Sequence, residues 1–133
     1  APRAPLCTPA IAARIKTPAD LMSEHLLRSY RADEWGQWFG AAGLAAPVLR
    51  GPIFDSSALM VSAAAAGQGI ALAPPVMFTR ELASDRLVQP FATTVDAGRY
   101  WLTRQMSRAE SDAMARFRAW LAAQIAAEAD LQD

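Results

Sequence analysis

The chain has 133 residues, the length of one domain, and its 53% hydrophobic and 20% charged content excludes intrinsic disorder. Thirteen basic and thirteen acidic residues give a formal net charge of zero, so no long-range field draws the chain toward nucleic acid or an anionic membrane. No membrane-spanning apolar run or signal peptide is recognisable, and the one cysteine, Cys7, lacks an internal disulfide partner. These features predict a soluble domain of the cytoplasmic type. Because the first residue is alanine rather than methionine, we expect an excised, processed or partial product.

The first half of the chain predicts helices and strands in alternation. Thr8 and Thr17 each precede a proline, an arrangement that starts helices, and Asp33 is a candidate cap for a third helix. Leu6 and Cys7 belong to a predicted strand, with Cys7 as a small buried hydrophobe. The further predicted elements are, in chain order, helices at 8–15 and 17–25, a strand at 26–30, a helix at 33–42 with Trp35, Trp38 and Phe39 on one face, and a strand at 47–54.

The second half continues the alternation and ends in a long amphipathic helix. The predicted elements are a helix at 57–66, a strand at 70–73, a helical turn at 77–83, a short strand at 87–89, a strand at 99–106 and a helix at 107–128. This order predicts an α/β layer structure with a largely parallel sheet. The last strand and helix have no evident partner in the chain, so the predicted architecture is incomplete.

The strongest local motif is Asp55-Ser56-Ser57, between a predicted strand and a predicted helix. In open α/β sheets ligands bind beyond the carboxyl ends of strands, where helix N-termini present free N–H groups. The functional interpretation is a site for a carboxylate or another anionic group. The alternative is ordinary capping of the helix by Asp55 or Ser56, which on the residues alone is the more common case.

Other kinds of chemistry have weaker support. The only histidine, His25, could be drawn into a triad with Asp55 and Ser57, but the spacing does not support it and no nucleophile-elbow motif is present. One histidine and one cysteine cannot form a structural zinc site, so no metal is expected. Gly67-Gln68-Gly69 precedes a strand, the reverse of a dinucleotide-binding motif, and no cofactor is expected. We therefore expect that the chain is not an enzyme.

Several runs in the chain resemble the effector-binding domain of LysR-type transcriptional regulators. The family-level runs are Phe54-Asp55-Ser56-Ser57, the segment Gly67 to Pro74, and Arg86 to Phe91, with Leu6-Cys7-Thr8-Pro9 at the start. Three further runs, at 26–31, 78–82 and 98–104, resemble the members of this family that regulate inducible β-lactamase. The resemblance covers essentially the whole chain, in order.

This resemblance implies a fold and a domain organisation. The implied fold is a periplasmic-binding-protein-like α/β effector domain, here one complete Rossmann-like lobe plus the returning strand and helix of the other lobe. Residues 1–98 would form the second lobe, and residues 99–133 the strand and C-terminal helix that return to the incomplete first lobe. The DNA-binding winged helix-turn-helix of the family is absent from the sequence, so contact with DNA would be made only through that missing part.

The resemblance also implies a ligand and its binding residues. The implied effector is a peptidoglycan fragment, either an anhydro-muropeptide or a UDP-muramyl pentapeptide, bound between two lobes. It assigns pocket roles to Ser57 and Tyr100, beside Ser56 and Asp55, whereas a contributing threonine of the other lobe has no counterpart. A homo-oligomeric, cytoplasmic regulator without membrane contact is implied. The alternatives are a ligand-binding or enzymatic α/β domain with a different ligand, and an assembly module that pairs through its aromatic helix.

Overall fold

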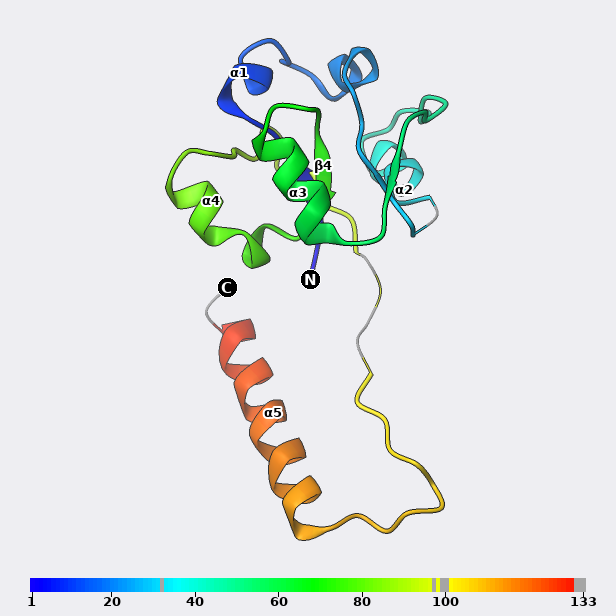
Figure 1. Ribbon diagram of the computed structural model, residues 1–133, viewed down its shortest axis with the longest axis vertical. Coiled ribbons are helices and arrows are strands. Elements are labelled where there is room, and N and C mark those ends of the chain that lie inside the picture. Colours follow the sequence, from blue (N-terminus) through cyan, green and yellow to red (C-terminus); the bar gives the residue numbers. More distant parts are fainter. Residues whose placement is uncertain (32, 97, 99–100, 131–133) are drawn as a thin grey trace. The chain divides into compact units, whose positions relative to one another are not determined.

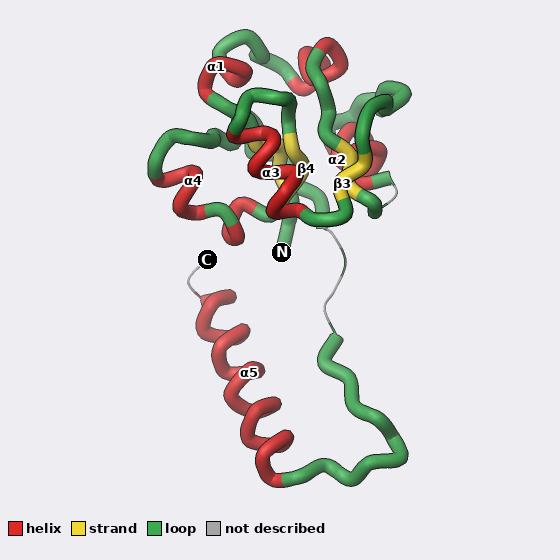
Figure 2. Tube along the Cα trace, in the orientation of Figure 1, coloured by secondary structure: helices red, strands yellow, loops and turns green. Residues whose placement is uncertain are grey.

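The computed structural model describes residues 1–31, 33–96, 98 and 101–130, and the chain divides into two units, 1–99 and 100–133. Their elements are drawn in Figures 1 and 2. The first unit contains β1 (Ala4–Leu6), α1 (Pro9–Ala12), the 3-10 helix η1 (Pro18–Ser23), β2 (Arg28–Ser29), α2 (Glu34–Ala41), β3 (Ile53–Phe54), α3 (Ser57–Ala65), β4 (Ala71–Ala73), the 3-10 helix η2 (Pro75–Met77) and α4 (Thr79–Ala83), and the second contains α5 (Asp112–Asp130).

The strands of the first unit pair in both directions. β2 and β3 are parallel, with Ser29 opposite Phe54, and an isolated parallel bridge joins Leu26 to Ile70 just before β4. β1 is antiparallel to β4, with Leu6 opposite Ala71. The prediction of a largely parallel sheet is therefore wrong for β1. Mixed sheets of this kind are common in α/β folds.

The reversed direction of β1 brings several chain segments to one edge of the unit. β2, β3 and β4 run the same way and end at this edge, which we call the carboxyl edge. Because β1 runs the opposite way, the chain enters the unit there, at residues 1–3. It also leaves there, since the backbones of Arg3 and Val95 form an antiparallel bridge. The ends of three strands and both chain connections of the unit thus share the carboxyl edge.

Two groups of buried apolar side chains form the core of the first unit. The larger group includes the aromatic face of α2, where Trp38 and Phe39 are fully buried and Trp35 is nearly so. The smaller group joins α3, through Met60 and Val61, to β1 and β4. The aromatic residues of α2 are therefore core residues, and the interpretation of α2 as a module that pairs through these rings is wrong.

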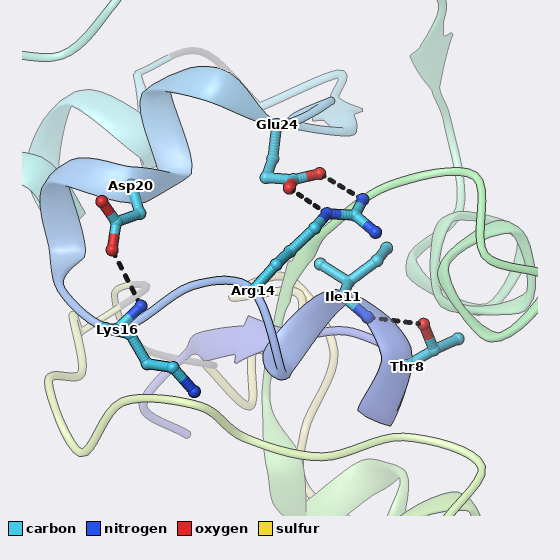
Figure 3. Close-up of polar contacts among 6 residues, drawn as sticks. All are labelled: Thr8, Ile11, Arg14, Lys16, Asp20 and Glu24. Carbon is cyan, nitrogen blue, oxygen red and sulfur yellow. Dashed lines mark hydrogen bonds and ion pairs between the residues drawn. The ribbon is translucent and has the colours of Figure 1, made fainter.

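Several predicted elements are shorter than expected. In the predicted strand 47–54 only Ile53 and Phe54 pair with a neighbour. Pro47 and Pro52 have no N–H to donate, and Gly51 has a φ of +99°, outside the extended region. The segment predicted as a helix at 17–25 is a 3-10 helix, in which Asp20 accepts hydrogen bonds from the backbone N–H groups of Lys16 and Thr17, both at 2.8 Å. Figure 3 shows the first of these bonds.

The second unit contains a helix but no strand among its described residues. Residues 99 and 100 of the predicted strand 99–106 lie outside the described residues, and residues 101–106 form no strand. A strand needs a neighbour that accepts its backbone hydrogen bonds, and the described part of this unit offers none. The predicted terminal helix is present but begins at Asp112, where Ser111 Oγ accepts from the N–H of Met114 at 3.3 Å.

Candidate functional site

The candidate site lies at the carboxyl edge, where the parallel strands β2 and β3 end together. The backbone N–H of Tyr30 donates to the carbonyl of Phe54 at 2.9 Å, which extends the pairing by one residue beyond the two strands. Asp55 and Ser56 follow directly, and Ser57 is the first residue of α3. The predicted strand-to-helix junction is therefore present, and it lies beside the end of a second parallel strand.

The structure does not support the interpretation of this motif as ordinary helix capping. Ser56 occupies the N-cap position of α3 in an extended conformation, but its side chain makes no capping hydrogen bond. Asp55 is exposed, and among the described residues neither its carboxylate nor the hydroxyls of Ser56 and Ser57 have a side-chain hydrogen bond. The polar side chains at the start of α3 therefore do not cap the helix. They remain available to a ligand, together with the N–H groups of the first turn, which carry the positive end of the helix dipole.

The end of β2 contributes polar residues that sequence reasoning missed. Ser29 Oγ accepts from the N–H of Arg31 at 3.2 Å, which shapes the turn out of the strand. The Arg31 guanidinium lies 4.8 Å from the centroid of the Tyr30 ring, whose residue is 58% exposed. The sequence did indicate a positive charge at the end of this strand, because Arg31 directly follows the predicted strand 26–30. Without the parallel register of β2 and β3, nothing indicated that this turn and Ser57 share an edge.

The other predicted site residue, Tyr100, lies outside the described residues. The structure therefore brings together Asp55, Ser56 and Ser57, at the end of one strand, with the turn that follows another.

The geometry does not support a catalytic triad of His25, Asp55 and Ser57, the arrangement considered from the sequence. His25 precedes Leu26, at the amino end of the segment that leads into β2, whereas Asp55 and Ser57 follow the carboxyl end of β3. The histidine and the other two residues thus lie at opposite ends of the parallel pair. A triad requires hydrogen-bond contact between these side chains, which this arrangement excludes.

Neither Cys7 nor a metal cluster provides a reactive centre in the described part of the chain. Cys7 is fully buried, and burial, assisted by the negative charge of Glu24, raises the pKa of its thiol to about 11. A buried thiol that stays protonated is a packing residue rather than a nucleophile. No group of three or more potential metal ligands occurs among the described residues. Within the same residues, no helix combines the length and the hydropathy needed to cross a membrane.

Comparison with known proteins identifies relatives over nearly the whole chain. The transcriptional activator AmpR of Pseudomonas aeruginosa is 54% identical over 131 residues, which is 97% of this chain but 44% of that relative. The chain thus spans less than half the length of this relative.

Solved structures give the same result. The effector domain of Pseudomonas aeruginosa AmpR matches with a TM-score of 0.92 and 53% identity, over 99% of this chain and 65% of that one. A Citrobacter freundii effector-binding domain matches with a TM-score of 0.83 and 49% identity, over 91% of this chain and 62% of that one. That domain contains three substitutions, which replace a threonine by valine, a serine by alanine and a tyrosine by phenylalanine.

A family match agrees with these relatives and covers residues 1–126, under the description LysR substrate binding domain. The fold is accordingly α/β and periplasmic-binding-protein-like, as the resemblance implied. With this match and these identities, the chain belongs to the LysR substrate-binding domain family.

Proposed function

We propose that the chain is the larger part of the effector-binding domain of an AmpR-like regulator that controls β-lactamase expression. The observation that carries this proposal is the match to Pseudomonas aeruginosa AmpR, at 54% identity over almost the entire chain and a TM-score of 0.92 to its effector domain. The runs that resemble regulators of inducible β-lactamase point to the same branch of the family. In this proposal the chain senses a ligand and catalyses no reaction.

The proposed effector site contains Ser57, Ser56 and Asp55 at the carboxyl edge, with Tyr100 as a further contact. Support comes from the spacing of two side chains. Ser57 and Tyr100 are 43 positions apart, and the substituted serine and tyrosine of the Citrobacter freundii domain are separated by the same number of positions. The substitutions there remove a hydroxyl from each residue. This spacing is expected if both pairs are equivalent.

The chemistry of the carboxyl edge suits a peptidoglycan fragment. An anhydro-muropeptide or a UDP-muramyl pentapeptide carries several carboxylates and amides, and the pentapeptide carries phosphates as well. The N–H groups that open α3 favour anions, and the serine hydroxyls can donate to amide or carboxylate oxygens. Arg31, at the end of β2, adds a positive charge at the same edge. Asp55 would instead accept from an amine or amide N–H of the peptide.

The remaining organisation follows from the same proposal. Residues 1–98 form the second, Rossmann-like lobe. Residues 99–133 supply α5 to the first lobe, together with a segment that becomes a strand only when the first lobe provides a neighbour for it to pair with. The exposed apolar side chains of α5, which include Phe117, Trp120 and Ile125, are then covered by that lobe. The complete regulator is a cytoplasmic homo-oligomer that contacts DNA through a winged helix-turn-helix outside this sequence and responds to the effector by a shift between lobe arrangements.

Isothermal titration calorimetry tests the proposal on a complete effector domain that contains this chain. We expect binding of the UDP-muramyl pentapeptide, and a decrease in affinity of about tenfold on Ser57→Ala and on Tyr100→Phe, because each substitution removes one hydrogen bond to the ligand. Ser62→Ala is the matched control, since Ser62 is an exposed serine farther along the same helix.

Two results would contradict parts of this proposal. Unchanged affinity of both hydroxyl-deletion variants would remove Ser57 and Tyr100 from the site. Absence of binding by the unmodified domain, to the pentapeptide and to an anhydro-muropeptide alike, would remove the peptidoglycan effector. Hydrolysis of either ligand by the domain would contradict the assignment as a non-catalytic sensor.

A further inference from the structure

Helix α2 contacts both of the chain segments that enter and leave the first unit. It is the first helix after β2, which ends at the carboxyl edge, and it begins five positions after the last residue of that strand. Its side chains contact Arg3, within residues 1–3, and Phe91 and Thr93, within residues 91–95. We call these two stretches the connecting segments, because the chain passes through them into and out of the unit.

The contact with the first connecting segment is a buried ion pair. Arg3 is the one buried charged residue among those the structure describes, and its guanidinium pairs with the carboxylate of Glu34. The two side chains are 6% and 11% exposed. Glu34 is the first residue of α2, where a negative charge also complements the helix dipole.

The contact with the second connecting segment comes from Trp38, one turn farther along α2. Its indole N–H donates to the carbonyl of Thr93 at 2.9 Å, across 55 residues of sequence. Its ring also lies 6.0 Å from that of Phe91. The two connecting segments are in turn joined to each other, because the N–H groups of Arg3 and Val95 each donate to the other's carbonyl, at 2.8 and 3.0 Å.

An ion pair in this position is not explained by stability alone. Removal of two charges from water costs several kcal/mol, and apolar replacements of similar volume are often equally stable or more so. An ion pair does impose one geometry, since each charge accepts few alternative partners. The position of this pair, between the helix that follows β2 and the segment through which the chain enters the unit, indicates that its role is to hold the two in register.

We propose that α2 is a clamp that fixes the connecting segments relative to the carboxyl edge, with Glu34 and Trp38 as its positioning residues. Through this clamp, effector binding at the ends of β2 and β3 is transmitted to the segments that lead to the rest of the protein. The transmission rests on the proposed function, whereas the clamp itself does not. Neither residue is assigned a contact with the effector.

Hydrogen exchange of the backbone amides tests the clamp without any ligand. In the 133-residue chain we expect Glu34→Gln and Trp38→Phe to accelerate exchange of the Arg3 and Val95 amides by about tenfold. The amides of Cys7, which follows β1, and Val88 also donate to each other's carbonyls; they serve as an internal reference and should change less than about twofold.

Matched variants separate this local effect from general destabilisation. Glu81→Gln removes a first-turn glutamate from α4, and Trp35→Phe removes an indole that donates to Leu27 within the core rather than to a connecting segment. Both should leave the Arg3 and Val95 amides at their original rates. The exchange of charges in Arg3→Glu with Glu34→Arg should restore slow exchange. If Glu34→Gln and Trp38→Phe leave both amides unchanged, or accelerate the reference amides equally, the clamp is overturned.

Transmission is tested in a full-length regulator that contains this domain, with the UDP-muramyl pentapeptide as the probe. We expect Glu34→Gln to keep the affinity within about threefold while it reduces the effector-dependent change in transcription at least about fivefold. An effector response like that of the unmodified regulator overturns transmission. If the unmodified regulator does not bind the pentapeptide, the proposed function and the transmission both fail, and hydrogen exchange still decides the clamp.

Discussion

At the scale of single residues, Arg14 and Glu24 form an ion pair in the first unit in which both carboxylate oxygens take part. Arg14 Nε and a terminal guanidinium nitrogen donate to the two carboxylate oxygens of Glu24 at 2.5 and 2.7 Å, in a bidentate geometry (Figure 3). The pair joins the residue after η1 to the turn after α1, ten positions earlier. The hydrogen bonds from Arg14 lower the pKa of the Glu24 carboxyl below its usual range and raise that of the guanidinium.

The lowered pKa of Glu24 predicts a stability contribution that depends on pH. The ionised form is favoured in the folded protein, so the contribution is complete above the ordinary value of 4.5 and is lost as the pH falls through the lower folded value. We expect Glu24→Gln to lower the Tm by a few degrees at pH 7, and only modestly because Arg14 is largely exposed. The difference from the unmodified chain should shrink toward zero as the pH falls below about 4. Thermal unfolding at a series of pH values measures it, and a difference that is constant across the series would contradict the assignment.

Helix caps show which local contacts can be predicted from residue type alone. Thr8 was predicted to cap α1, and its hydroxyl does accept from the N–H of Ile11, at 3.4 Å. Asp33 occupies the predicted N-cap position of α2, but the predicted capping hydrogen bond of its side chain is absent. Asp33 has a φ of +66°, and its carboxylate lies against Gly36, where a Cβ would be 1.9 Å from an aspartate oxygen. In this left-handed conformation, which differs from the extended one usual at an N-cap, the side chain makes no capping hydrogen bond, and residue type does not reveal this.

At the scale of elements, the junction of β4 with the segment before β2 depends on Gly69. The backbone here is close to the neighbouring segment, since Ile70 N–H donates to the carbonyl of His25 at 2.8 Å and Leu27 N–H donates to that of Ile70 at 2.9 Å. A Cβ on Gly69 would lie 2.3 Å from the His25 carbonyl oxygen. The predicted boundary between the helix 57–66 and the strand 70–73 is confirmed, and Gly69 is the residue that allows the two strands to approach.

Two glycine substitutions should therefore differ strongly in their effects on stability. We expect Gly69→Ala to lower the free energy of unfolding by about 3 kcal/mol or more, because the methyl group collides with backbone that cannot move without breakage of the bridge. Gly67→Ala, with a φ of +76° and open space around the Cβ, should cost only about 1 kcal/mol of left-handed strain. Urea denaturation of both variants measures the difference. Equal costs would show that steric contact at Gly69 does not control this pairing.

At the scale of the whole molecule, the core contacts of the described residues in the first unit fall within residues 1–95. The last residues to contribute are Phe91, Thr93 and Val95, which contact Trp38 and Arg3. Within the second unit, Glu110 and Arg118 form an ion pair, in which the guanidinium donates hydrogen bonds of 2.9 and 3.2 Å to the carboxylate.

Truncation of the chain tests whether the first unit is a self-sufficient lobe. We expect a chain that ends at residue 98 to unfold cooperatively, with a Tm within about 3 °C of the 133-residue chain, because it keeps every core contact described above. A chain that ends at residue 90 loses Phe91, Thr93 and Val95 and should be less stable by about 10 °C or more. Circular dichroism during a thermal scan distinguishes the two. Loss of cooperative unfolding in the longer truncation would contradict the boundary at residue 98.

The sequence by itself determined the α/β class, the family, the aromatic face of α2 and the junction at Ser57, because each depends on the local order of residue types. The tertiary structure alone decided the antiparallel direction of β1, the absence of a strand at 101–106, and the meeting of Tyr30 and Arg31 with Asp55 at one edge. It also decided that Arg3 pairs with Glu34 and that Trp38 bonds to Thr93. Local order encodes helix and strand propensity through neighbouring residues, whereas strand direction and pairing depend on contacts between residues that are far apart in the chain.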